Sequence, residues 1–187
     1  MKTNKIAIII VCIVLSAVIL MGLFLYFVFG TKEKVSYDIN MWDDMQVSHD
    51  YLPAVNEIGD YTDVEFKHLH KDMSILFQSD AYILKASFTT QEFEKQISHV
   101  ESKYHFQETV TSDDDKKIEN DTFFELDDFQ FKLLSLDEYN LEYPKQMVFI
   151  GISHKSKEIA YVYYIDMDLD YIDSSFQDFL KKECGWE

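Results

Sequence analysis

The order of hydrophobic and polar residues divides the chain into a long apolar stretch and a patterned domain. Residues 6–29 contain no Asp, Glu, Lys or Arg and are interrupted only by Ser16, Gly22 and Tyr26. As a helix this stretch would be about 36 Å long, more than the ~30 Å of a bilayer's hydrocarbon core. The apolar region of a cleaved signal peptide is shorter, at about 7–15 residues. The pattern therefore predicts a transmembrane signal anchor over residues 6–29.

Flanking charges predict the orientation of that anchor. Residues 1–5 carry Lys2 and Lys5 without an acidic residue, whereas Lys32 and Lys34 on the other side are accompanied by Glu33. The more positive flank stays in the cytoplasm. The prediction is a cytoplasmic N-tail at residues 1–5 and a single-pass protein of the cell membrane with an extracytoplasmic C-terminal domain.

Residues 30–50 mix polar residues with scattered apolar ones, including Met41 and Trp42. Both side chains are costly to leave in water. We interpret this segment as a stalk that partly docks on the domain formed by residues 51–187.

Period-two alternation dominates that domain and predicts strands at residues 64–70, 73–78, 82–88, 124–126, 129–133, 147–152 and 159–165. The last two are apolar on both faces and belong in the middle of a sheet. Helices are expected at residues 52–59, 89–104 and 174–183. The fold class is α+β: an antiparallel β-sheet of five to six strands with two helices packed on it, preceded by the single N-terminal transmembrane helix.

The helix over residues 89–104 has the clearest signals. Thr89 and Glu92 stand three positions apart, in the arrangement of a capping box. The apolar residues that follow recur at helical spacing and form one stripe: Phe93, Ile97, Val100 and Tyr104.

The charged residues limit the classes of molecule that the chain can bind. The formal net charge is −17, and all 17 basic residues are lysines. A nucleic-acid binder needs a basic face and favours arginine, so nucleic acid is excluded as a partner. An acidic surface suits a basic protein. The two cysteines, Cys12 and Cys184, give no disulfide framework.

His68 and His70 form one candidate pair of metal ligands. On a strand, residues two apart point to the same face, as a pair of metal ligands requires. A third ligand has to come from elsewhere, such as His105 or His154, and none stands at local spacing. The prediction is two half-exposed rings near a strand end and no metal site.

Acidic clusters give a second candidate, for calcium. Asp166, Asp168 and Asp170 alternate and are followed by Asp173, but the glycine and the bidentate glutamate of a calcium loop are missing. A solvated acidic strand end is the expectation, with a weak calcium site as the alternative. The consecutive acidic residues 113–115 are interpreted as a solvated loop, and no cofactor is expected.

The sequence contains no motif of a hydrolase, a metalloprotease or a nucleotide-binding loop. Tyr161, Tyr163 and Tyr164 can line a ligand groove, although their strand spacing is more typical of a core. The chain is therefore not expected to be an enzyme.

The predicted function is a membrane-anchored, non-enzymatic protein-binding module outside the cytoplasm. Immunity proteins that neutralise toxins and accessory subunits of envelope complexes are small domains of this kind. The alternative is a ligand sensor or an envelope-acting enzyme without a recognisable motif, which would need a deep pocket with convergent polar groups.

Overall fold

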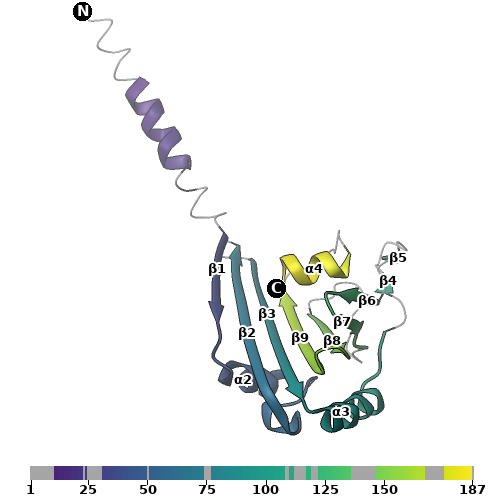
Figure 1. Ribbon diagram of the computed structural model, residues 1–187. Coiled ribbons are helices and arrows are strands. Elements are labelled where there is room, and N and C mark those ends of the chain that lie inside the picture. The colour runs from purple at the N-terminus through teal and green to yellow at the C-terminus, as the bar shows by residue number, and fades with distance from the viewer. Residues whose placement is uncertain are drawn as a thin grey trace, which may run out of the picture.

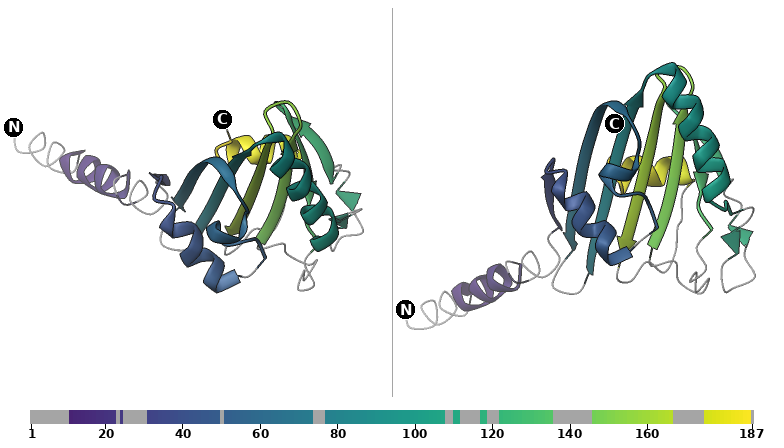
Figure 2. Two further views of the ribbon diagram at one scale, coloured as in Figure 1. Left: turned by 60° about the horizontal axis from the view of Figure 1, so that its bottom comes forward. Right: turned by 90° about the horizontal axis from the view of Figure 1, so that it is seen from below.

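The computed structural model of the 187-residue chain describes residues 11–22, 24, 31–49, 51–73, 77–107, 110–111, 117–118, 122–135, 146–166 and 175–186. The domain is a single curved sheet with helices on both of its faces (Figures 1 and 2). The α+β class and the antiparallel sheet are as the sequence predicts.

The main sheet has seven antiparallel strands. In spatial order they are β1 (Thr31–Ser36), β2 (Tyr61–Met73), β3 (Phe77–Phe88), β9 (Glu158–Asp166), β8 (Gln146–Ser153), β7 (Phe129–Leu133) and β6 (Phe123–Leu126). A separate pair consists of β4 (Val110–Thr111) and β5 (Lys117–Ile118). The expectation of five to six strands is too low.

Helices cover the sheet from both sides (Figure 2). One face carries α2 (Asn40–His49), the 3-10 turn η1 (Val55–Glu57) and α3 (Thr90–Lys103), and the other carries α4 (Phe176–Lys182). The expectation of two packed helices is therefore also too low.

The central hairpin β8–β9 explains why both faces are covered. Alternate residues of β9 enter different cores: Tyr161 and Tyr163 pack under α2 and α3, and Val162 and Tyr164 pack under α4. All four side chains are buried. A strand that is apolar on both sides has to lie inside a sheet, so the prediction from residues 147–152 and 159–165 is confirmed.

Helix α3 is confirmed with its predicted start. The Thr89 hydroxyl accepts a hydrogen bond from the backbone N–H of Glu92 at 3.3 Å, which satisfies one of the free donors of the first turn. The predicted stripe faces the sheet: Phe93, Val100 and Tyr104 are buried and Ile97 packs beside them.

The region of β2 and β3 differs from its prediction. Three strands were expected at residues 64–70, 73–78 and 82–88, but the structure has two long strands that pair from Tyr61 to Met73 and from Phe77 to Phe88. The polar residues Lys71 and Asp72 interrupt the apolar pattern without ending the strand. Similarly, the helix expected at residues 52–59 is only the short turn η1.

The prediction of a transmembrane helix over residues 6–29 is contradicted by the structure. Helical residues 11–22 extend about 18 Å at 1.5 Å per residue. Within the described residues, no helix is both long enough and apolar enough to cross a membrane. The single-pass signal anchor over residues 6–29, and the membrane localisation with an extracytoplasmic C-terminal domain that followed from it, are therefore not supported. Residues 1–10, 23 and 25–30 lie outside the described residues.

The segment interpreted as a partly docking stalk, residues 30–50, docks through Trp42 as expected, and its described residues pack more extensively on the sheet. Strand β1 pairs along β2 in the main sheet, and α2 packs on one face of the sheet. Trp42 of α2 is fully buried, and its indole N–H donates to the carbonyl of Pro53 at 2.9 Å. This segment is thus part of the folded domain, because burying a Trp side chain contributes several kcal/mol.

Gly151 tests the packing of the central strands. A Cβ at this position would lie 2.5 Å from the ring of Phe131, the residue that pairs with it across β7 and β8. We expect Gly151→Ala to lower the free energy of unfolding by about 1–3 kcal/mol, because the buried Phe131 ring has little room to move. Urea unfolding followed by circular dichroism measures the change.

Gly22→Ala is the matched control, since its Cβ would meet no atom within 4 Å. It should leave the unfolding midpoint unchanged, and Phe131→Leu should recover part of the stability in the Gly151→Ala background. Parental stability of Gly151→Ala would show that the two strands are not packed in this register.

Candidate functional site

The hairpin β2–β3 brings together the side chains with the most distinctive chemistry. His68 and His70 lie on the same face of β2, as predicted from their spacing. The register pairs His70 with Asp80 and His68 with Tyr82 on β3. Asp80 therefore stands directly beside the histidine pair, on the face that also carries α2 and α3.

Short polar contacts join these residues. His68 Nε2 lies 2.7 Å and His70 Nδ1 lies 2.8 Å from the same oxygen, Asp80 Oδ1. On its other side, His70 Nε2 lies 2.9 Å from Asp72 Oδ1. An ionised carboxylate only accepts hydrogen bonds, so both nitrogens of His70 are placed as donors.

The local electrostatics follow from these contacts. Burial opposes the charged form of His70, but the hydrogen bonds and charges of Asp80 and Asp72 outweigh it and raise the pKa of the imidazole. Burial also opposes the charged form of Asp80, yet the hydrogen bonds from His68 and His70 lower the pKa of its carboxyl. An imidazolium between two carboxylates is the arrangement that these shifts favour.

His68, His70 and Asp80 form a group that we call the His–Asp cluster. Aromatic rings extend from this cluster across the sheet. The His68 ring stacks on Tyr82 with centroids 4.4 Å apart, and Tyr82 is followed by Tyr163 at 6.1 Å and then Tyr51 at 6.4 Å. Burial and the charge of Asp80 raise the pKa of Tyr82 to about 12, so its phenol stays neutral at physiological pH. The row fixes the orientation of the His68 ring.

Other residues considered from the sequence lie elsewhere. His105 and His154 are exposed, neither belongs to the His–Asp cluster, and the His154 ring contacts Phe93. Burial raises the pKa of the Cys184 thiol, which is fully covered. The three tyrosines of β9 (Tyr161, Tyr163 and Tyr164) are core residues. Asp168, Asp170, Asp173 and residues 113–115 lie outside the described residues, and Asp166 accepts from the Tyr164 hydroxyl at 3.0 Å.

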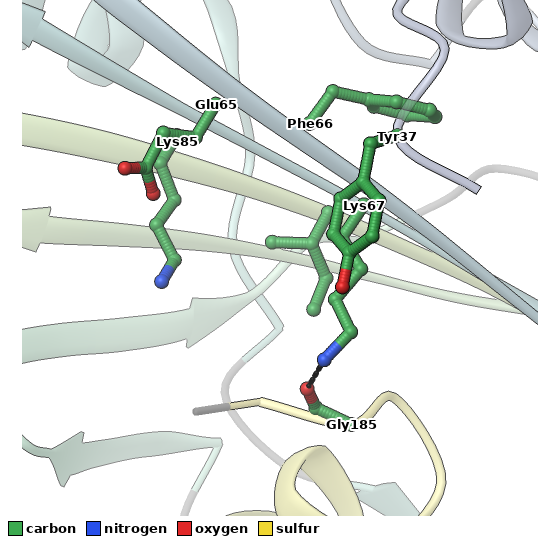
Figure 3. Close-up of a pocket in the computed structure, with 7 residues that line it drawn as sticks. Tyr37, Glu65, Phe66, Lys67, Lys85 and Gly185 are labelled. Carbon is green, nitrogen blue, oxygen red and sulfur yellow. Dashed lines mark hydrogen bonds between the residues drawn. The ribbon is translucent and has the colours of Figure 1, made fainter. Parts of the chain in front are cut away.

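A second feature is a cavity of about 520 Å³ on the α4 face of the sheet. Figure 3 shows the Lys67 ammonium donating to the carbonyl of Gly185 at 2.8 Å. Tyr37, the residue that follows the edge strand β1, belongs to the cavity lining. The lining comes from the residue after β1, from β2 and β3, and from the C-terminal segment: Tyr37, Glu65, Phe66, Lys67, Ile83, Lys85 and Gly185.

Two more lysines hold the C-terminal segment on the sheet. The ammonium of the buried Lys71 donates to the carbonyl of Lys182 at 2.6 Å and pairs with Glu183 at 3.0 Å, at the negative end of α4. The Lys85 ammonium lies 4.4 Å from the ring centroid of Trp186. These contacts position the wall of the cavity.

Asp80 is the site residue that the sequence analysis missed. Its position depends on where the chain turns between β2 and β3, and the expected break at residues 71–72 placed that turn too early. A hairpin centred on residue 75 pairs position 70 with position 80, so the correct turn would have predicted the contact.

The chain matches no family model, and no curated protein and no solved structure is significantly similar to it. Relatives therefore add nothing to the fold or to the site.

The pKa shifts predict how the cluster contributes to stability. A raised His70 pKa gives stability that is complete below its unfolded value of about 6.5 and is lost as the pH rises through the folded value. A lowered Asp80 pKa gives stability that is complete above its unfolded value of about 3.9 and is lost as the pH falls through the folded value. We therefore expect Asp80→Asn to destabilise the chain most between about pH 4 and 6.5.

Urea unfolding of both chains at pH 5.5 and pH 9, with a chelator present, measures this difference. The charged or titratable groups near His70 are His68, Asp72, Asp80 and, through Asp72, Lys34 at 3.8 Å. Asp128→Asn is the control, because its pair with Lys155 is exposed and contributes little. An equal loss for Asp80→Asn at both pH values would contradict the assigned ion pairs.

Proposed function

We propose that the chain is a non-enzymatic protein-binding module that accepts an extended segment of its partner along β1. The observation that carries this proposal is the position of β1 at the edge of the main sheet, beside the cavity. Among the described residues, β2 is the only strand that pairs with β1. The other side of β1 can therefore take a further strand by main-chain hydrogen bonds.

The side chains of β1 suit a selective edge. Lys32, Glu33 and Lys34 are exposed, and charged residues on an edge oppose pairing between copies of the same sheet. A partner strand has to offer matching charges before it can pair. These charges therefore disfavour the addition of unmatched strands to β1, while the backbone of β1 stays accessible to a matched one.

Two exposed apolar residues give the edge a place for partner side chains. Val35 is 49% exposed and Tyr37 is 72% exposed, and the second lines the cavity. Val35 pairs with Leu69 of the core under α4, and Tyr37, the residue after β1, lines the cavity, so both belong to the α4 face. Strand addition takes its affinity from the backbone and its specificity from pockets for alternate side chains.

The net charge of −17 supports a basic partner, because complementary charge accelerates encounter and disfavours other proteins. Neutralisation of a basic toxin and an accessory role in a protein complex are both served by such binding. Neither role needs a reaction at the site.

A displayed library of nine-residue peptides, selected on the full chain, tests the proposal. We expect an apolar anchor that fills the cavity, acidic residues where the peptide lies beside Lys32 and Lys34, and basic residues in the rest of the peptide. Tyr37→Ala should weaken the binding of selected peptides at least about tenfold, because an exposed Tyr at a pocket is a typical hot spot. Amide hydrogen exchange should show new protection within β1 in the bound state.

Phe123→Ala is the matched control, since Phe123 is 49% exposed on β6 at the opposite edge of the sheet. Its effect on affinity should stay within about twofold. Peptides that bind Tyr37→Ala as tightly as the parent, or that leave the exchange of β1 unchanged, would refute strand addition at this edge.

A further inference from the structure

The His–Asp cluster has chemistry that strand addition at β1 does not use. Its three candidate donor atoms, one each from His68, His70 and Asp80, lie within 4.8 Å of one another. Two imidazole nitrogens and one carboxylate oxygen are a common ligand set of zinc sites that keep a fourth position open. We propose that His68, His70 and Asp80 bind one Zn²⁺ ion.

The donor atoms need only a small movement to reach coordination distances. Zinc bonds of about 2.0–2.2 Å at tetrahedral angles place neighbouring ligand atoms about 3.3 Å apart. The two imidazole nitrogens lie 2.7 and 2.8 Å from Asp80 Oδ1, where protons now occupy the positions between them. Replacing these protons by one ion widens each separation by about half an ångström, which side-chain rotation supplies.

Asp72 supports the ion from behind His70. Its carboxylate accepts from His70 Nε2 at 2.9 Å, which leaves Nδ1 as the nitrogen that faces Asp80 and the metal. A carboxylate behind a ligating histidine fixes the tautomer and raises the basicity of the ligand. Gln78 donates to the same Asp72 oxygen at 3.3 Å and helps to hold it.

Charge and access also fit a divalent ion. The carboxylates of Asp72 and Asp80 balance the two positive charges of Zn²⁺ when both histidines are neutral. The His70 and Asp80 side chains are 22% and 26% exposed, whereas His68 is 9% exposed and is held by the Tyr82 ring. Water or an external donor can thus reach the fourth position from one side.

Nitrogen donors set the metal class. Imidazole favours zinc and the later transition metals, whereas magnesium and calcium prefer carboxylate and carbonyl oxygens. The site is therefore distinct from weak cation binding to the acidic surface, which magnesium would share.

Calorimetric titration of the full chain with Zn²⁺ at pH 7.5, in buffer containing excess Mg²⁺, tests the site. We expect saturable binding of one ion per chain, with proton release because the ion replaces protons on the ligands. Co²⁺ in place of zinc should give the intense visible absorption of a four-coordinate ion. This absorption should disappear when Zn²⁺ is added.

Variants separate this site from other histidines. His68→Gln and His70→Gln should each weaken zinc binding at least tenfold, and Asp72→Asn, which keeps all three ligands, should weaken it about 10- to 100-fold. His105→Gln is the matched control, because it makes the same chemical change at an exposed histidine outside the cluster. Its affinity should stay within about twofold of the parent.

Far-ultraviolet circular dichroism without metal checks that each variant is folded. If His68→Gln or His70→Gln does not fold, Asp72→Asn tests the site. The proposal is overturned if the folded parent binds no zinc, or if Mg²⁺ displaces the ion. It is also overturned if folded Asp72→Asn binds zinc like the parent, or if His105→Gln loses as much affinity as His70→Gln. Because none of these variants alters Val35 or Tyr37, peptide binding at β1 is scored separately.

Discussion

Strands β8 and β9 bury side chains on both faces of the sheet, and the other elements are placed by the need to exclude water from both. Val148 and Ile150 meet the core under α2 and α3, whereas Met147 and Phe149 meet the core under α4. A single layer of helices would leave one of these faces in water, at a cost of about 1.5–3 kcal/mol for each large apolar side chain. The three-layer arrangement follows from this constraint.

Where buried positions recur at a helical or strand period, the apolar residues of the sequence were sufficient to predict the element. Helix α3 shows its start in Thr89 and its buried face in Phe93 and Val100, and the central hairpin shows near-continuous apolar runs. Each signal is local and reports directly on which side chains leave water. Expectations that relied on such signals agree with the structure.

Other features depend on information that no local period carries. Strand β1 (TKEKVS) has no apolar alternation because it lies at an edge. The main sign of α2 in the sequence is the buried Trp42. The absence of charged residues from residues 6–29 is a property of composition and does not fix the length of a helix. The membrane helix predicted from it is not found among the described helices. Asp80 could not be joined to His68 and His70 because Lys71 and Asp72 look like a turn while lying inside a strand.

The separation of contacts along the chain has a consequence for the order of folding. His68 and Asp80 are only 12 positions apart, whereas Ser87 and Glu158, which join β3 to β9 by a hydrogen bond of 3.0 Å, are 71 apart. Hairpins close in about 1–10 μs, and long-range strand pairing waits on the entropy of closing a large loop. We therefore expect β2–β3 and β8–β9 to form as separate early units. Their docking, with β7 and α3 carried in between, is the slow step that creates the continuous sheet.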